Sequence, residues 1–225
     1  MGNEGIMALG HVLNGSVNPS GRLTDTYVRD FSTDPAWQNF SVNMGSTDKK
    51  ADGGTGNSYH TLDTRKNVGK YTAYFYVEYE EGIYVGYRYW ETAAEEGYID
   101  YEQSVVYPFG YGLSYTSFEQ TFDSITRKTD KDGHAYYEAK VTVCNTGDVA
   151  GKDVVQLYLT APYVDGGIEK AHVVLAAYDK TSLLQPGKSE TLTLTVYEQD
   201  VASYDYNDAN VNGHKGYELD EGEYI

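Results

Sequence analysis

The sequence predicts a mainly β protein whose second half folds as a β-sandwich of the immunoglobulin or fibronectin type. From Ser117 onward, short runs of alternating apolar and polar residues are separated by turn signals such as Asp132-Gly133 and Pro186-Gly187. This spacing is typical of antiparallel strands in two packed sheets. The composition agrees, because the chain has 24 Tyr against 6 Phe and 2 Trp, and Tyr favours half-buried strands.

The alternation places the strands of this sandwich, and Cys144 lies at the end of the second one. As the single cysteine of the chain, it excludes an internal disulfide and is expected to be a small core residue. The last strand is expected to be cut short at the end of the sequence. The candidate strands are Ser117–Ser124, Tyr136–Cys144, Asp153–Leu159, His172–Tyr178, Glu190–Val196 and Gly222–Ile225.

Apolar spacing in residues 3–15 predicts a short amphipathic helix. Gly15 suits a left-handed helix end. A helix of this length needs a partner surface to be stable, so we expect residue 1 to lie inside a larger domain. The apolar face of the helix would be formed by Ile6, Leu9, Val12 and Leu13.

The segments between this helix and the sandwich are expected to be a strand, a long loop and an aromatic connection. Residues 22–28 alternate as a strand does, and the polar residues 32–70 predict a long surface loop. Residues 83–90 alternate with a period of two and predict a second strand. Residues 107–115 indicate a glycine-punctuated linker. We therefore divide the chain into residues 1–70, 71–116 and 117–225.

The charge of the chain restricts its partners. A net charge of -17 repels phosphate backbones and anionic lipid surfaces, so neither nucleic acid nor a membrane is an expected partner. The sequence has no apolar run of the roughly 20 residues that a membrane helix needs. Nucleotide-binding glycine motifs are absent as well, and we expect no cofactor.

Three motifs follow one another along the chain. They are Asn18-Pro19-Ser20-Gly21-Arg22-Leu23, Glu81-Gly82-Ile83-Tyr84-Val85-Gly86-Tyr87-Arg88-Tyr89 and Tyr107-Pro108-Phe109-Gly110-Tyr111-Gly112-Leu113-Ser114-Tyr115-Thr116. In this order they resemble family 3 glycoside hydrolases of the β-glucosidase kind. The first motif is similar to the turn that ends the α/β sandwich domain of that family, the second to a later stretch, and the third to the entry of the fibronectin-III-like domain. The resemblance covers nearly the whole chain, and residues 32–70 match least.

The resemblance implies the tail of an α/β sandwich domain followed by a fibronectin-III-like β-sandwich. It also implies a bacterial parent enzyme that hydrolyses terminal β-D-glycosidic bonds with retention and uses two carboxyl groups. The family carries its nucleophile in a barrel domain and its acid/base in the sandwich domain upstream of the Asn18–Leu23 turn, both outside this sequence. We therefore assign no catalytic residue and expect the missing domains to be partners. Residues 25–27, 202–205 and 215–217 resemble bacterial members with a permuted domain order.

Tyr84, Arg88 and Trp90 are the candidate substrate-binding residues. On a strand they would share one face and present an aromatic edge to sugar. The alternative is that this face packs the sandwich against the neighbouring domain, since aromatic side chains also dominate interfaces.

Metal binding is weakly supported by the sequence. Asp130-Lys131-Asp132-Gly133 carries part of a calcium-loop pattern, but it lacks the first ligand position and a properly spaced Glu, so we favour an Asp-Gly hairpin turn. The five histidines show no ligand spacing, so no metal site is expected.

The sequence therefore predicts a non-catalytic portion of a β-glucosidase-like enzyme that braces the catalytic domains and is inactive alone. The substrate of that parent would be an oligo- or polysaccharide. The alternative is a freestanding carbohydrate-binding or adhesion module on the same sandwich. Sugar specificity and compartment, whether cytoplasmic or extracytoplasmic, do not follow from these residues.

Overall fold

The computed structural model describes residues 5–39 and 79–225. They belong to two compact units, one made of residues 1–25 and 108–225, the other of residues 26–107. The larger unit thus joins the start of the chain to its second half, which differs from the three consecutive parts expected from the sequence. Most of the predicted loop 32–70, and residues 71–78 of the aromatic segment, lie outside the described residues.

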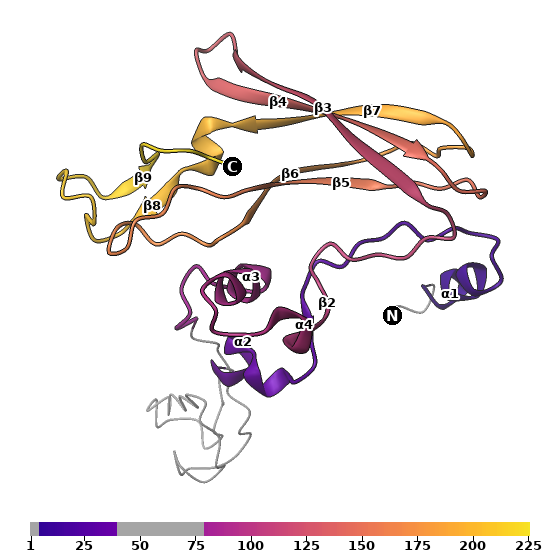
Figure 1. Cartoon of the computed structure of the whole chain (residues 1–225), viewed down its shortest axis with the longest axis horizontal. Helices are drawn as coiled ribbons and strands as arrows, with labels where there is room; N and C mark the ends of the chain where they lie inside the picture. The colour runs from indigo at the N-terminus through magenta and orange to yellow at the C-terminus, as the bar shows by residue number, and fades with distance from the viewer. Residues whose placement is uncertain (1–4, 40–78) are drawn as a thin grey trace, which may run out of the picture. The chain divides into compact units, whose positions relative to one another are not determined.

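The larger unit is a sandwich of two antiparallel sheets. One sheet has the order β3-β4-β7 and the other pairs β5 with β6. Figure 1 shows the two sheets as layers that face each other. Their strands are β3 (Phe118–Thr129), β4 (Ala135–Asn145), β5 (Val154–Leu159), β6 (Val174–Lys180) and β7 (Ser189–Tyr197). The fold class predicted from the alternation is confirmed.

The core of the sandwich lies between these sheets. Its buried side chains come from alternate positions of the strands, because successive side chains of a strand point to opposite faces. This alternation corrects the expectation for Cys144. Val143 is fully buried, whereas Cys144 beside it is only half-buried and faces away from the core. The core cluster consists of Val141, Val143, Val155, Leu184, Leu192 and Leu194.

Two features at the end of the chain differ from the sequence prediction. Residues 222–225 do not form a regular strand, although Ile225 pairs with Thr160 through two backbone hydrogen bonds. A short hairpin, β8 (Ser203–Asp205) and β9 (Gly216–Glu218), was not predicted. Each of its strands has three residues, which is too short for an alternation to be visible in sequence.

The predicted Asp-Gly turn is confirmed. The carboxylate of Asp130 accepts hydrogen bonds from the backbone N–H groups of Asp132 and His134, both at 2.9 Å. The turn joins β3 to β4.

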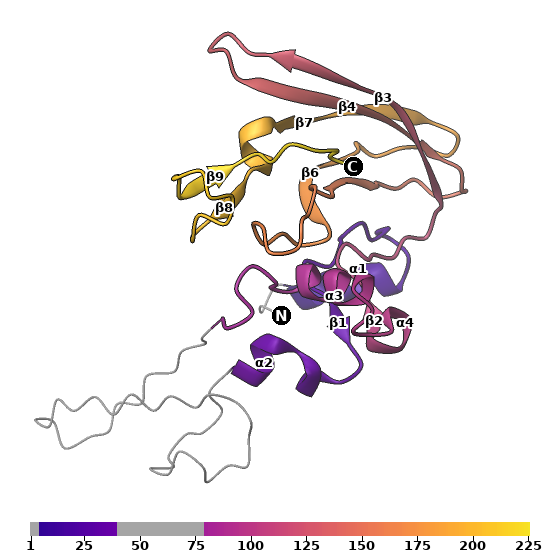
Figure 2. The ribbon, with the colours of Figure 1, turned by 60° about the vertical axis from the view of Figure 1, so that its left-hand side comes forward.

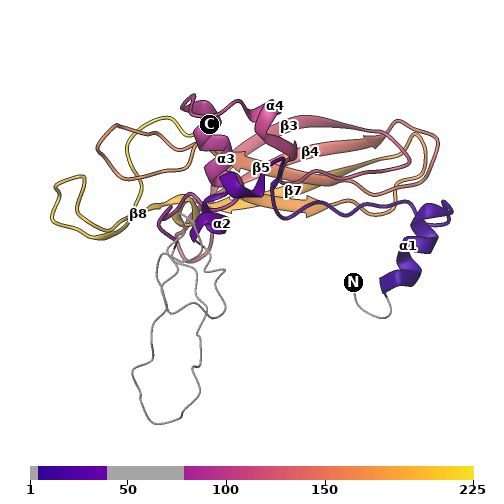
Figure 3. The same cartoon turned by 90° about the horizontal axis from the view of Figure 1, so that it is seen from below.

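The predicted N-terminal helix is present as α1 (Gly5–Leu13), and Gly15 follows it with the expected positive φ of 76°. None of its side chains is buried. Ile6 is 52% exposed and Leu13 74% exposed, so the apolar face is not covered by the described residues. In Figure 3, α1 and β8 lie toward opposite ends of the larger unit.

The smaller unit is built from short elements around one buried tryptophan. β1 pairs antiparallel with β2, and Trp90 packs with Val28 and Val105 in a small core. Figure 2 shows the helices of the unit gathered beside this strand pair. The elements are β1 (Tyr27–Val28), the 3₁₀ helix η1 (Phe31–Thr33), α2 (Pro35–Asn39), α3 (Tyr87–Glu95), α4 (Tyr101–Ser104) and β2 (Val105–Tyr107).

The prediction of a strand over residues 83–90 is wrong, because α3 begins at Tyr87. Gly86 precedes the helix with φ 60° and ψ -131°, a conformation that glycine adopts readily. Trp90 and Ala93 are both buried and lie three residues apart on one helix face. A run of only eight residues with alternating aromatics is too short to distinguish the period of two of a strand from the 3.6-residue period of a helix. The predicted strand 22–28 is likewise reduced to Tyr27–Val28.

Replacing Trp90 with Ala should lower the free energy of unfolding by about 3–5 kcal/mol, because a large side chain is removed from a packed core. Chemical denaturation followed by circular dichroism would measure this. The matched control is Trp37→Ala, since Trp37 is 54% exposed and its loss should change the midpoint little. Equal effects of the two substitutions would contradict the described core.

Candidate functional site

The three predicted sugar-binding residues do not share a face. Trp90 is 2% exposed, and its ring makes an edge-to-face contact with Tyr89 at a centroid distance of 5.0 Å. Its place in the core of the smaller unit leaves no ring surface for stacking on a sugar. Tyr84 lies in the turn before α3, and Arg88 lies in its first turn. Both are half-buried.

Polar contacts of the larger unit join three segments that lie far apart in sequence. We call this site the junction, and its segments are residues 18–23, 108–116 and 145–153. At one end, the Asn18 amide donates to Ala150 O at 3.0 Å and its oxygen accepts from Tyr115 N at 2.8 Å and Ser114 Oγ at 3.1 Å. One side chain thus holds two other segments.

Backbone pairing continues this junction. Leu23 N donates to Tyr111 O and Gly110 N donates to Leu23 O, both at 2.8 Å. Two glycines are required here for different reasons. A Cβ on Gly112 would lie 2.5 Å from the backbone oxygen of Gly21, whereas Gly110 has a φ of +78°, which other residues rarely adopt. Gly112 therefore allows close approach of the chain segments, and Gly110 allows the backbone to turn.

A buried ion pair is the electrostatic centre of the junction. Arg22 Nη2 donates to Asp153 Oδ1, with the Asp153 side chain 4% exposed and that of Arg22 30% exposed. The second carboxylate oxygen accepts from Gln120 Nε2 at 2.7 Å. The backbone of Asp153 exchanges hydrogen bonds of 3.0 Å with Thr181, which is itself buried. Both carboxylate oxygens are satisfied, as a buried charge requires.

Asn145 provides a second buried polar centre. It is 0% exposed, and its amide donates to Val149 O and Leu184 O, both at 2.9 Å. Its oxygen accepts from Thr116 Oγ1 at 2.7 Å and from Gly147 N at 3.1 Å. It ties the linker to the end of β4 and to the loops that contain Val149 and Leu184.

At the other end of the sandwich, the β8–β9 hairpin is held by two acidic residues, Asp205 and Asp220. The Asp205 carboxylate, 1% exposed, accepts backbone N–H groups from Asn207, Ala209 and Asn210 at 3.0–3.3 Å. Burial acts to raise the pKa of Asp205, but these donors outweigh it and hold the pKa below its usual value.

Asp220 closes the same loop onto the sandwich. Its carboxylate accepts from the ammonium of Lys170 and, at 2.8 Å, from Asn210 Nδ2. Lys170, whose side chain is 5% exposed, also donates to Pro162 O. Burial acts to raise the pKa of Asp220, and the two donors lower it to a net value below the ordinary one.

Within residues 5–39 and 79–225, no three His, Cys, Asp or Glu side chains gather in an arrangement that could hold a metal ion. The same residues include no helix long and apolar enough to cross a bilayer. The carboxylates of Asp153, Asp205 and Asp220 are engaged by donors from the chain itself, so each of them fixes a loop or strand.

Comparison with known proteins agrees with this fold. The family model of the fibronectin type III-like domain matches residues 153–224, so the sandwich contains a domain of that class. "Beta-glucosidase A" of Butyrivibrio fibrisolvens is 37% identical over 99% of this chain and 23% of its own length. "Beta-glucosidase" of Ruminococcus albus is 38% identical over 99% of this chain and 19% of its own length.

A solved structure gives the same result. The crystal structure of a β-glucosidase from Paenibacillus barengoltzii matches with a TM-score of 0.70 and 36% identity, over 96% of this chain and 19% of that one. The chain therefore corresponds to the portion of glycoside hydrolase family 3 β-glucosidases that carries their fibronectin type III-like domain. It spans about a fifth of the length of these relatives.

Replacing Arg22 with Met should destabilise the larger unit by about 3 kcal/mol, because the buried Asp153 carboxylate loses its cation. Urea denaturation measures the change. The control is Arg127→Met, since Arg127 is 57% exposed and pairs with Glu198 at the surface, where an ion pair contributes less. An Arg22 variant no less stable than the Arg127 variant would contradict the role of this pair.

Stability should also depend on Asp220 at acid pH. Because folding lowers the pKa of this carboxyl, its contribution is present above the ordinary Asp pKa of about 3.8 and is lost as pH falls through the lower folded value. Asp220→Asn should therefore reduce the difference in unfolding midpoint between pH 6 and pH 3. Asp148→Asn, at an exposed position, is the control. The same pH dependence in both variants would contradict the assignment.

Proposed function

We propose that this chain is a non-catalytic portion of a retaining β-glucosidase-like hydrolase and that it braces the catalytic domains of the parent enzyme. The observation that carries the proposal is the extent of the match. It takes in 96–99% of this chain but only about a fifth of each relative. The parent would act on terminal β-D-glycosidic bonds of oligo- or polysaccharides, with both catalytic carboxyl groups contributed by its other domains.

The exposed face of α1 supports a role in domain packing. Ile6, Leu9 and Leu13 are 43–74% exposed on a nine-residue helix, and a helix of that length is marginal without tertiary contacts. We infer that this face packs against the α/β sandwich domain of the parent. The junction would then hold the segment that follows α1 firmly on the fibronectin-like sandwich.

Contact with substrate is proposed only for the smaller unit. Tyr84 and Arg88 are half-buried, so part of each side chain stays accessible for a sugar hydroxyl or ring. Trp90 would contribute indirectly, because its packing in the core fixes the position of α3. In this proposal the three residues belong to one local structure but have different roles.

A freestanding carbohydrate-binding module is the second candidate function, and one observation favours it. Tyr204 and Tyr217 form an edge-to-face pair on the β8–β9 hairpin with ring centroids 5.1 Å apart. They are 55% and 72% exposed. Exposed tyrosines of this kind combine apolar ring surface with a polar tip.

The chain alone should release no nitrophenol from an aryl β-glucoside, because the proposal assigns no catalytic carboxylate to it. A chimaera of the P. barengoltzii β-glucosidase that carries this chain in place of its equivalent portion should hydrolyse the same substrate. The same enzyme without the portion should not.

Turnover by the isolated chain, surviving repurification, would overturn the proposal. Titration calorimetry with cello- and xylo-oligosaccharides separates the second candidate. Binding that disappears in Tyr217→Ala but persists in Tyr178→Ala, another exposed tyrosine, would favour a binding module.

A further inference from the structure

The β8–β9 hairpin turns its polar side inward and its aromatic side outward. Because successive side chains of a strand point to opposite faces, Ser203, Asp205 and Glu218 share one face. Tyr204 and Tyr217 are paired directly across the strands and share the other face. The polar face is buried or half-buried, whereas Tyr204 is 55% and Tyr217 72% exposed. Burial of apolar surface would favour the opposite arrangement.

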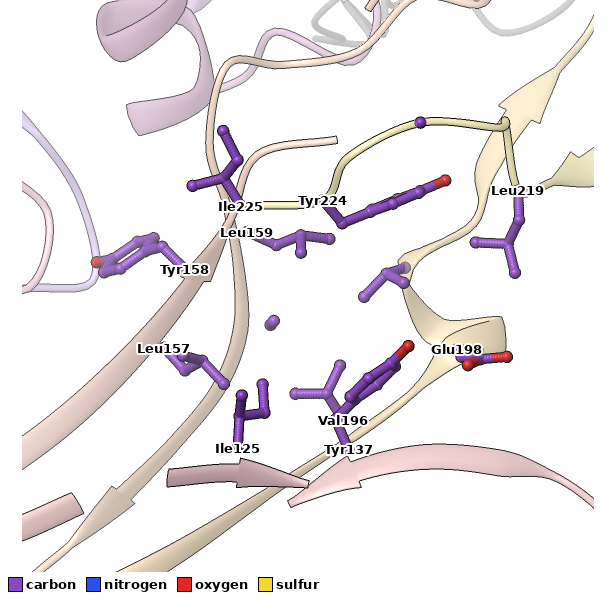
Figure 4. A pocket seen from close by; sticks show the side chains of 13 residues that line it. Ile125, Tyr137, Leu157, Tyr158, Leu159, Val196, Glu198, Leu219, Tyr224 and Ile225 are labelled. Atoms are coloured by element: carbon purple, nitrogen blue, oxygen red, sulfur yellow. The ribbon is translucent and has the colours of Figure 1, made fainter. Parts of the chain in front are cut away.

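The larger unit has apolar space in which tyrosines are sheltered, and the rings of the hairpin do not use it. An apolar cavity of about 490 Å³ opens between the two sheets, beside β5. Figure 4 shows Tyr137 and Tyr224 at this cavity, and both are half-buried. Tyr204 and Tyr217 do not line it. Packing of the sandwich therefore does not explain the two outward rings.

The backbone that carries these rings is fixed by the polar face. The Asp205 carboxylate accepts three backbone N–H groups of the loop between the strands. The side-chain amides of Asn210 and Asn212 donate to Glu218 Oε2 at 3.1 Å and 2.8 Å. A surface that is ordered before it binds loses less conformational freedom on binding, and tyrosine side chains have few torsions to fix.

The charges of the hairpin favour an uncharged ligand. Residues 203–220 carry four Asp and Glu against one Lys, so an anion is repelled, as is a second copy of this acidic chain. All four carboxylates already accept hydrogen bonds from the chain itself, which leaves little for a cation to gain.

The size of the aromatic face favours a small ligand over a protein. A stable protein interface covers roughly 800 Å² on each partner, whereas a tyrosine supplies only about 150–250 Å². A pyranose ring matches the pair better. It has a face of C–H groups that stacks on an aromatic ring, and hydroxyl groups at its rim that bond to the phenol oxygens.

We propose that the outer face of the β8–β9 hairpin is a binding site for an uncharged oligosaccharide, with Tyr217 as the ring on which a pyranose stacks. Tyr204 meets Tyr217 edge to face, with 70° between the ring planes, and holds its orientation. The inference rests on the second candidate function and deepens it by naming the ligand class and the stacking ring. It is compatible with the bracing role, since the hairpin and the junction lie at opposite ends of the sandwich.

Titration calorimetry of the full chain with cellohexaose or xylohexaose tests the site, with hexagalacturonate as the anionic probe. The neutral sugars should bind and hexagalacturonate should not. Tyr217→Ala should weaken binding by at least about tenfold because the stacking surface is lost, and Tyr217→Phe should keep the affinity within about threefold. The matched control is Tyr178→Ala, which removes a 71% exposed ring from β6 and should leave the affinity unchanged.

Two further measurements separate a binding role from a structural one. Loss of the exposed Tyr217 ring should leave the thermal midpoint within about 2 °C. Cellohexaose should shift the NMR signals of the Tyr204 and Tyr217 ring protons in the unsubstituted chain, a readout that does not depend on any variant folding.

Several outcomes would overturn the proposal: no binding of neutral sugar, binding that survives Tyr217→Ala, or ring signals that do not move. A chain that is dimeric in sedimentation and monomeric as Tyr217→Ala would assign the face to a second copy and overturn it as well. The bracing role is tested separately by turnover of the aryl β-glucoside by the chimaera. An inactive chimaera overturns that role alone, and an active chimaera with no sugar binding by the chain overturns the hairpin site alone.

Discussion

The buried carboxylate of Asp153 is the contact on which the larger unit depends. It binds Arg22 from the turn after α1, Gln120 from β3 and, through its backbone, Thr181 after β6. A charge that is 4% exposed is stable only when its partners are in place. The turn after α1, strand β3 and the loop after β6 are therefore held in one arrangement by one residue.

Buried polar groups such as this carboxylate hold chain segments together outside the apolar core. The core cluster lies between the sheets, whereas Asn145 and the glycines of the linker lie at the edge, where chain segments cross. At the other end, Asp205 and Asp220 fix the β8–β9 hairpin. Burial of apolar area fixes the two layers, and directional hydrogen bonds fix how the loops and the N-terminal segment attach to them.

The alternating strands β3, β4, β5, β6 and β7 could be predicted because each is long enough to show a period of two and is bounded by turn residues. The same reasoning failed for residues 83–90, where helix α3 begins at Tyr87. There the aromatic alternation is too short to define a period, and burial of Trp90 against Val28 and Val105 decides the structure. The predicted role of Trp90 in sugar stacking was based on that strand.

The sequence by itself determined the β-sandwich, its turns and the family, because alternation, turn residues and contiguous motifs are local properties that a chain carries in order. Only the tertiary structure showed that Arg22 meets Asp153, 131 residues away, that Trp90 is buried, and that a cavity opens beside β5. Each of these features depends on which segments pack together. That packing is decided by burial and hydrogen bonding summed over the whole unit, and no local sequence pattern shows it.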